Sequence, residues 1–224
     1  MIINVENLSK EYFRNGKSFL AVNNVTFNIN SGDYIGITGE SGSGKSTLFN
    51  MMGGILEPSN GKIIIDGENM HNLSFNKKSD LRNSKISYIL QGQNLFNNFN
   101  VLDNVCMPYY LSNSKDNINI RKKAEEILDQ VGLIDMKNSF PYELSGGEMR
   151  RVAIARAIIN NPSLIIADEP TDSLDRDNGE EVMKIFSKIS NKGTAVLVST
   201  HDLYFRKYIK TLYKMEKGFM ERAL

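Results

Sequence analysis

Hydrophobic and polar residues alternate in the first third of the chain, which is the pattern of half-buried β-strands. Residues 2–8 and 21–29 each fit this alternation. A third apolar stretch, at 62–66, runs into Asp66 and Gly67, a dipeptide that favours tight turns. We therefore expect these segments to form an antiparallel β-sheet.

Short apolar runs without alternation predict a second set of strands, which are expected to be buried. The run at 164–167 is unbroken and suits a central parallel strand that is covered on both faces. The other runs of this kind lie at 33–38, 86–90 and 195–200. A last hairpin is expected around Gly218.

Helical spacing of apolar residues appears between these runs. Residues 121–131 place Ala, Ile, Leu and Val on one face, and Gly132 is expected to end that helix. Further helices are predicted at 149–159 and 178–189. We interpret roughly 92–155 as a helical insertion into an α/β core.

Composition narrows the class of protein. A chain of 224 residues with 41% hydrophobic and 24% charged residues suits one compact domain. The net charge of +1 gives no reason to expect a nucleic-acid partner. Cys106 is the only cysteine, which excludes an internal disulfide and a cysteine metal cluster. The sequence shows no signal-peptide pattern and no run of about eighteen apolar residues, so we expect a cytoplasmic protein that does not cross a membrane.

A glycine-rich loop lies between a predicted strand and a predicted helix and fits the pattern G-x-x-x-x-G-K-[ST]. Its backbone N–H groups and the helix that follows are suited to phosphate. Lys45 is expected to reach the β- and γ-phosphates, and the hydroxyl of Ser46 to ligate Mg²⁺. The residues of the loop are Gly39, Glu40, Ser41, Gly42, Ser43, Gly44, Lys45, Ser46 and Thr47.

A second glycine pair opens the helix predicted at 149–159. Ser145 and Glu148 have the spacing of a capping box, which accounts for both of them. It does not account for Gly146 and Gly147, because glycine is a poor helix residue. Two glycines at a helix start let an anion approach the backbone, so we predict a second phosphate contact here.

Polar residues follow two of the predicted buried strands. Asp168 and Glu169 end the run at 164–167, where open α/β sheets bind ligands. Asp168 is expected to bind Mg²⁺ or its hydration shell, and Glu169 to polarise the attacking water. His201 ends the run at 195–200 at the same edge, which predicts a contact with the γ-phosphate.

Tyr12 lies in a polar, glycine-containing segment between the first two predicted strands. Two interpretations fit it. The ring is either a platform on which adenine stacks or an aromatic side chain that packs under a loop. The residue pattern alone favours packing.

Taken in order, the motifs GESGSGKST, Gln91, LSGGE, LIIADE, SLD and His201 resemble the ATP-binding subunit of an ABC transporter, and the resemblance covers essentially the whole chain. LSGGE is highly specific to that family, whereas the P-loop alone is not. The resemblance implies an α/β P-loop NTPase with a RecA-like core. Residues 1–91 and 156–224 would form this core and an antiparallel β subdomain, and 92–155 a helical subdomain.

The resemblance assigns roles within one ATP site. Tyr12 matches the aromatic residue that stacks on adenine, which reverses the preference above. Gly39 to Thr47 match the Walker A loop, and Asp168 and Glu169 match Walker B and the catalytic base. His201 matches the switch histidine. ATP and Mg²⁺ are the implied ligands.

Other matched residues face a second subunit or the membrane. Ser145, Gly146 and Gly147 match the signature that contacts the γ-phosphate bound to the other subunit, and Asp175 matches the D-loop. Gln91 matches the glutamine that touches Mg²⁺ and faces the membrane subunit. The resemblance therefore implies a two-fold homodimer, P-loop to LSGGE, on the inner face of the membrane beside a separate permease.

Within the family the chain is similar to the short ATPases of lipoprotein-release and of macrolide or antimicrobial-peptide exporters. Glu148 and Met149 stand where many members have glutamines, and Gly92 directly follows Gln91. Export is therefore the expected function. A mechanotransmission ATPase, which drives a cell-envelope or cell-division partner without moving cargo, is the alternative, and import is a third.

Overall fold

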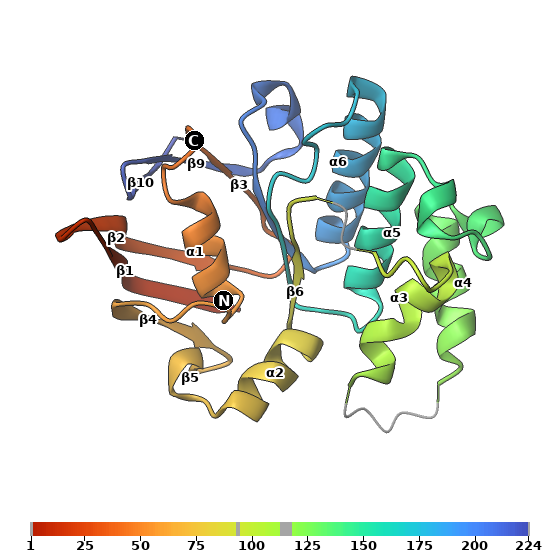
Figure 1. Ribbon diagram of the computed structural model, residues 1–224, viewed down its shortest axis with the longest axis horizontal. Helices are drawn as coiled ribbons and strands as arrows, with labels where there is room; N and C mark the ends of the chain where they lie inside the picture. Colours follow the sequence, from red (N-terminus) through yellow and green to blue (C-terminus); the bar gives the residue numbers. More distant parts are fainter. Residues whose placement is uncertain (1, 93–94, 113–117, 224) are drawn as a thin grey trace.

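The computed structural model describes residues 2–92, 95–112 and 118–223 (Figure 1). Its strands are β1 (Ile3–Arg14), β2 (Lys17–Ile29), β3 (Tyr34–Thr38), β4 (Asn60–Ile65), β5 (Glu68–Asn69), β6 (Ile86–Ile89), β7 (Leu164–Ala167), β8 (Ala195–Ser199), β9 (Thr211–Glu216) and β10 (Phe219–Arg222). Its α-helices are α1 (Lys45–Met52), α2 (Phe75–Ser84), α3 (Val101–Tyr110), α4 (Ile120–Gln130), α5 (Gly146–Ile158) and α6 (Arg176–Asn191).

The antiparallel sheet predicted from alternation is present, with strand order β2-β1-β4-β5. Its first hairpin is longer than expected, because β1 and β2 pair as far as Arg14 and Lys17. Asn15 and Gly16 form the turn with φ values of 51° and 72°. Asn-Gly is the dipeptide that two-residue hairpin turns favour, since both residues tolerate positive φ. The expectation that Tyr12 lies between two strands was therefore wrong, because Tyr12 is part of β1.

The second sheet has the order β10-β9-β3-β8-β7-β6. Strands β9, β3, β8, β7 and β6 run parallel, and β10 closes the edge as the hairpin predicted around Gly218. All residues of β7 and β8 are buried. Parallel strands that are covered on both faces read as continuous apolar runs, as both of these do. Their carboxyl ends lie at one edge of the sheet, where the candidate site is found.

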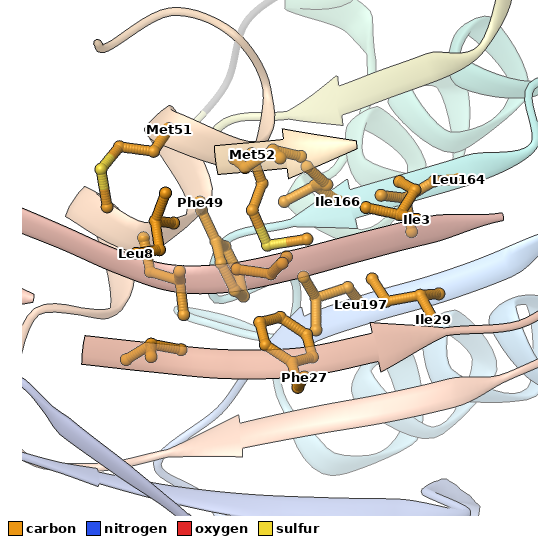
Figure 2. Close-up of a cluster of buried hydrophobic side chains, with 14 of the residues drawn as sticks. Ile3, Leu8, Phe27, Ile29, Phe49, Met51, Met52, Leu164, Ile166 and Leu197 are labelled. Carbon is orange, nitrogen blue, oxygen red and sulfur yellow. The ribbon is translucent and has the colours of Figure 1, made fainter. Parts of the chain in front are cut away.

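Helix α1 lies between the two sheets and joins them into one core (Figure 1). Phe49, Met51 and Met52 of this helix are fully buried. Figure 2 shows them among side chains from β1, β2, β7 and β8, such as Phe27 and Leu197. Burying side chains of this size contributes about 1.5–3 kcal/mol each, so α1 is held firmly under the loop that precedes it.

Helices α3, α4 and α5 form a second cluster beside the core (Figure 1). Val105, Leu128 and Val152, one from each helix, are fully buried in it. Helix α5 also faces the core, where Ile154 packs with residues of β7, β8 and α6. The boundary expected near residue 155 thus falls inside α5, which belongs to both parts. Within the described ranges, no helix combines the length and the apolar character needed to span a membrane.

Candidate functional site

The glycine-rich loop connects β3 to α1 and keeps the backbone path that the sequence predicts. Gly42 and Gly44 have φ values of 80° and 111°, which side chains rarely adopt. A Cβ at Gly44 would also overlap the carbonyl oxygen of Ala21, and one at Gly39 would overlap that of Met215. The loop is therefore packed tightly on its outer side and requires glycine at these positions.

Lys45 is buried at the start of α1. Its Nζ donates to the carbonyl oxygens of Gly39 and Glu40 at 2.8 and 2.9 Å. The ammonium group thus lies inside the loop, and among the residues that the structure describes it has no carboxylate partner and one N–H without an acceptor. Ser43 Oγ is also buried and has no hydrogen-bond partner among the described residues. A buried cation and an unsatisfied hydroxyl in one loop suit an anionic ligand.

The loop forms one wall of a cavity of about 590 Å³. His201 lies on its rim, and residues 214–217 of the β9–β10 hairpin form the opposite wall. Of the residues that the structure describes, neither Tyr12 nor the Ser145–Gly147 segment lines this cavity. The structure therefore brings the P-loop and His201 together and leaves those two predicted sites elsewhere on the chain.

Asp168 and Glu169 follow β7 and are held by one hydroxyl. Ser199 Oγ donates to Asp168 Oδ1 at 2.6 Å and accepts from the backbone N–H of Glu169 at 2.7 Å. Glu169 has a φ of 47°, so its backbone is left-handed and the two carboxylates leave the strand in different directions. Asp168 is buried, whereas Glu169 reaches solvent.

Glu169 meets two other predicted residues. Gln91 Nε2 donates to Glu169 Oε2 at 2.9 Å and lies 3.5 Å from Asp172 Oδ2. His201 Nδ1 is 3.8 Å from Glu169 Oε1, and the histidine side chain is 65% exposed. Gln91, Glu169 and His201 come from three segments that are far apart in the sequence and converge where the strands end. Glu169 and Gln91 can accept or donate hydrogen bonds to a water molecule, and His201 can donate to an anion beside it.

Ser199 and Arg150 are functional residues that the sequence interpretation missed. Arg150 is buried and its guanidinium donates to the carbonyl oxygens of Leu90 and Gly92 at 3.3 and 3.4 Å, which fixes the segment around Gln91. Burial lowers the pKa of Arg150, partly offset by Asp172. A polar residue at the end of a buried strand was a usable signal for Ser199, whereas nothing in the local pattern pointed to Arg150.

Helix α5 begins with the predicted capping box. Ser145 Oγ accepts from the N–H of Glu148 at 3.3 Å, and the Glu148 carboxylate accepts from the N–H of Ser145 at 2.7 Å. This backbone hydrogen bond and that of the Ser145 side chain lower the pKa of Glu148. Ser145 and Gly146 are exposed, so the N–H groups of this helix start are directed to a surface.

The two glycines of this helix start differ in their surroundings. A Cβ at Gly147 would overlap the side chain of Asn178 in α6, so the close approach of the two helices already explains this glycine. A Cβ at Gly146 would meet only Leu174 Cδ2, at 3.8 Å. Asp175 caps α6, where its carboxylate accepts from the backbone N–H and Nδ2 of Asn178 at 2.9 and 2.7 Å. These bonds lower the pKa of Asp175.

Tyr12 stacks on Phe19 of the neighbouring strand, with ring centroids 5.8 Å apart. Lys10 Nζ lies 5.5 Å from the centre of the tyrosine ring. Phe13 and Phe19 are 77% and 49% exposed, so the first hairpin carries aromatic surface into solvent. Tyr12 is half-buried in this aromatic group.

No group of three or more His, Cys, Asp or Glu side chains that could hold a metal ion occurs in the part of the chain that the structure describes. Asp168 is instead a single buried carboxylate with one hydroxyl partner. Ser46, the second residue of α1, is exposed. A single carboxylate with a hydroxyl is the donor set that Mg²⁺ uses when phosphate oxygens and water supply the other ligands.

Residues 22–172 match a family model described as ABC transporter. The chain is 42% identical over 219 residues to the lipoprotein-releasing system ATP-binding protein LolD of Buchnera aphidicola subsp. Schizaphis graminum. The matched region covers 97% of this chain and 95% of that protein.

Solved structures agree with this similarity. A dimeric structure of the ATP-binding cassette MJ0796 bound to ADP and Pi is similar with a TM-score of 0.89 and 33% identity, covering 100% of this chain and 99% of that one. The structure of cbiO1 from Clostridium perfringens, part of an ABC transporter complex, has a TM-score of 0.86 and 30% identity. That match covers 98% of this chain and 86% of cbiO1.

Proposed function

Because this chain belongs to the ABC transporter family, as an ATP-binding subunit with ATPase activity, we propose that it works as a two-fold dimer that drives a separate membrane subunit. The observation that carries the proposal is the position of its two anion-binding segments. The P-loop and His201 share one cavity, whereas the exposed start of α5 lies outside it. A second copy of the chain would bring that helix start to the phosphate.

The P-loop residues fit ATP. Within the described part of the chain, Lys45 has no carboxylate partner and the buried Ser43 Oγ has no hydrogen bond, so both have capacity for phosphate oxygens. We assign the β- and γ-phosphates to Lys45 and the N–H groups of the loop. Tyr12 on the exposed first hairpin is proposed to stack on the adenine ring.

The donor set of Ser46, Asp168 and Gln91 is suited to Mg²⁺, which prefers oxygen ligands and keeps several waters. When bound, Mg²⁺ neutralises charge that develops on the phosphate oxygens. Ser199 orients the buried side chain of Asp168. Gln91 Nε2 donates to Glu169, which holds the glutamine side chain beside the proposed catalytic carboxylate.

Glu169 is proposed to orient and polarise the attacking water. Its carboxylate lies between Gln91 and His201, and its left-handed backbone turns it away from Asp168. His201 is exposed beside the cavity and is proposed to donate to the γ-phosphate. The two residues would thus position the attacking water and the γ-phosphate. Positioning and electrostatic stabilisation are the main contributions of a protein to phosphoryl transfer.

The second copy is proposed to complete each site. Ser145 and Gly146, with Gly147 behind them, would place the start of α5 against the γ-phosphate of the partner's ATP. Asp175 would lie beside this contact, since it caps α6 next to Gly147. An isologous interface of this kind gives two ATP sites. The dimeric form of the similar cassette MJ0796, with ADP and Pi, supports the arrangement.

A groove of about 670 Å³ is proposed as the docking place of the membrane subunit. It lies between α2 and β6 on one side and α3 and α5 on the other (Figure 1). Leu90, Phe96 and Leu111 line it and are 45%, 47% and 71% exposed, so it presents apolar surface to a partner. The backbone after Leu90 leads directly to Gln91, which links docking to the ATP site.

We propose export of a lipoprotein, another lipophilic molecule or an antimicrobial peptide as the work that hydrolysis drives, with the chain peripheral on the inner face of the membrane. The 42% identity to LolD, which is named as part of a lipoprotein-releasing system, supports export. The alternative is mechanotransmission without cargo.

Purification of a tagged copy from membranes tests the proposal. We expect a membrane protein to co-purify, and a conduit in it favours export, whereas a large extracellular domain without a conduit favours mechanotransmission. Leu111→Ser in the groove should lower the yield of the co-purified membrane protein, whereas Phe219→Ser, which changes an exposed apolar residue of β10 outside the groove, should not. Absence of any membrane partner would contradict the proposed function.

A further inference from the structure

We propose that the segment of the membrane subunit that docks in the groove between α2 and α3 carries an aspartate or glutamate, which pairs with Arg156 and Arg82. This inference rests on the proposed docking function and adds a chemical requirement to it. The two arginines would select partners that place a carboxylate among apolar side chains.

The charged side chains that line the groove are all positive. Arg82 and Arg156 are its charged lining residues, and the others of the described chain that line it are apolar or neutral. Arg82 comes from α2 and Arg156 from α5, so the charges belong to both walls. A wholly apolar partner segment would bury these guanidinium groups without an opposite charge, which is unfavourable.

Arg156 lacks the partners that other arginines of α5 have. Its guanidinium lies 5.7 Å from the centre of the Phe96 ring, and it makes no hydrogen bond or ion pair with any residue that the structure describes. Arg150 in the same helix donates to two carbonyl oxygens, and Arg151 pairs with Glu181. Arg156 is therefore a partly buried cation with its hydrogen-bonding groups unused.

Over the described residues, the surroundings of Arg156 also lack a negative charge that would stabilise its guanidinium. Burial lowers its pKa, and no carboxylate offsets the effect. A charge in such a position is stabilised by an opposite charge from outside. Contact with an aromatic ring stabilises the cation only in part.

Among the described residues, Arg82 has one hydrogen bond, from Nη1 to the carbonyl oxygen of Gly54 at 3.1 Å. Its other N–H groups remain available on the opposite wall of the groove. A carboxylate accepts several hydrogen bonds and pairs with guanidinium in a two-pronged arrangement. Around it, Leu90, Phe96 and Leu111 supply apolar surface, which favours a protein segment over a free anion.

Photo-crosslinking identifies the occupant. Benzoylphenylalanine replaces Leu111 in the full chain, cells are irradiated, and mass spectrometry reads the crosslinked segment. We expect a segment of a membrane protein with an aspartate or glutamate among apolar residues. Failure to crosslink any membrane protein overturns the docking function itself, whereas a crosslinked segment without an acidic residue overturns only this inference.

Charge variants supply the second measurement, the amount of that membrane protein retained by a tagged chain. Arg156→Gln should lower retention at least about tenfold, since truncation of one partner of a buried charge pair is costly. Arg156→Lys keeps the charge and should retain more than Arg156→Gln. Arg121→Gln removes an arginine from α4, outside the groove, and is the matched control.

If Arg156→Gln retains as much of the membrane protein as Arg121→Gln does, the inference is overturned. A charge swap tests direct pairing: Arg156→Glu is combined with a membrane protein in which arginine replaces the crosslinked aspartate or glutamate. Recovery of retention supports direct pairing. Thermal unfolding establishes that each variant is folded. The crosslinked sequence decides the question independently of any arginine variant.

Discussion

The side-chain hydroxyl of Ser199 lies 2.6 Å from the carboxylate of Asp168, and both residues are buried. The same oxygen accepts from the N–H of Glu169, so one atom at the end of β8 fixes both acids that follow β7. This contact connects two neighbouring strands at the edge where the proposed ATP site lies. The geometry of the site thus depends on a residue that touches no phosphate in the proposed mechanism.

Ser199→Ala should therefore lower both stability and activity. It leaves the buried carboxylate of Asp168 and the N–H of Glu169 without their partner, a loss of about 1–3 kcal/mol. We expect a lower melting temperature and a lower kcat for ATP. Ser190→Ala is the control, because the buried hydroxyl of Ser190 donates to the carbonyl oxygen of Gly32 at 3.0 Å and accepts from Lys210 Nζ at 3.2 Å, so it too has two partners. Equal ATP turnover by the two variants would contradict a positioning role for Ser199.

Gly146 and Gly147 should respond differently to alanine. At Gly147 the new methyl group overlaps Asn178, so Gly147→Ala should separate α5 from α6 and lower the melting temperature of the monomer. At Gly146 the methyl group makes only an ordinary contact with Leu174, so Gly146→Ala should fold normally and impair the dimer formed with ATP. Thermal unfolding without nucleotide and sedimentation with ATP measure the two effects. A Gly146→Ala chain that dimerises like the parent would remove Gly146 from the proposed interface.

Glu169→Gln should keep ATP binding and trap the dimer. The amide keeps the shape of the carboxylate but cannot polarise water as an anion does, so bound ATP persists. Size-exclusion chromatography with ATP and Mg²⁺ should show a stable dimer, which falls apart on removal of nucleotide. A variant that stays monomeric under these conditions would rule out the proposed sandwich.

His201→Ala should lower turnover far more than affinity. The side chain is 65% exposed and packs against little, so its loss leaves the fold intact. Its proposed contact with the γ-phosphate strengthens as charge develops, which affects kcat rather than binding. Steady-state ATPase assays and equilibrium binding of a fluorescent ATP analogue separate the two quantities. Equal losses in both would make His201 a residue of ground-state binding.

Most of the fold could be predicted because each strand and most helices carry a local signal. The alternating stretch at 2–8 and the apolar run at 164–167 both form the expected strands. Helix α2 was missed because it has no buried residue and hence no apolar periodicity. Tyr12 was placed in a loop because the turn signal at 15–16 was not recognised.

The site residues could be predicted only where they belong to a motif of consecutive residues. The P-loop and the acids after β7 are such cases, and the structure places His201 beside both. Ser199 and Arg150 act through contacts between segments that are distant in the sequence, 31 residues for Ser199 with Asp168 and 60 for Arg150 with Leu90. Gly147 was interpreted as an anion contact because its neighbour Asn178 in α6 is invisible in a local pattern.

His71 provides a prediction about pH, because protonation of this residue is disfavoured in the folded chain. Its side chain is 9% exposed, its Nε2 is buried without a partner among the described residues, and its Nδ1 lies 2.8 Å from Glu57. Burial lowers the pKa of His71, and the nearby carboxylate of Glu57 offsets this only in part. The unfolded chain therefore takes up a proton at a higher pH than the folded chain does.

The sign of the effect follows from proton binding. As the pH falls through the unfolded value of about 6.5, the unfolded state binds more protons, and the free energy of unfolding decreases. We expect urea denaturation to show lower stability at pH 5.5 than at pH 7.5, and His71→Gln to reduce that difference. A His71→Gln chain with the same pH dependence as the parent would show that His71 is not the titrating group.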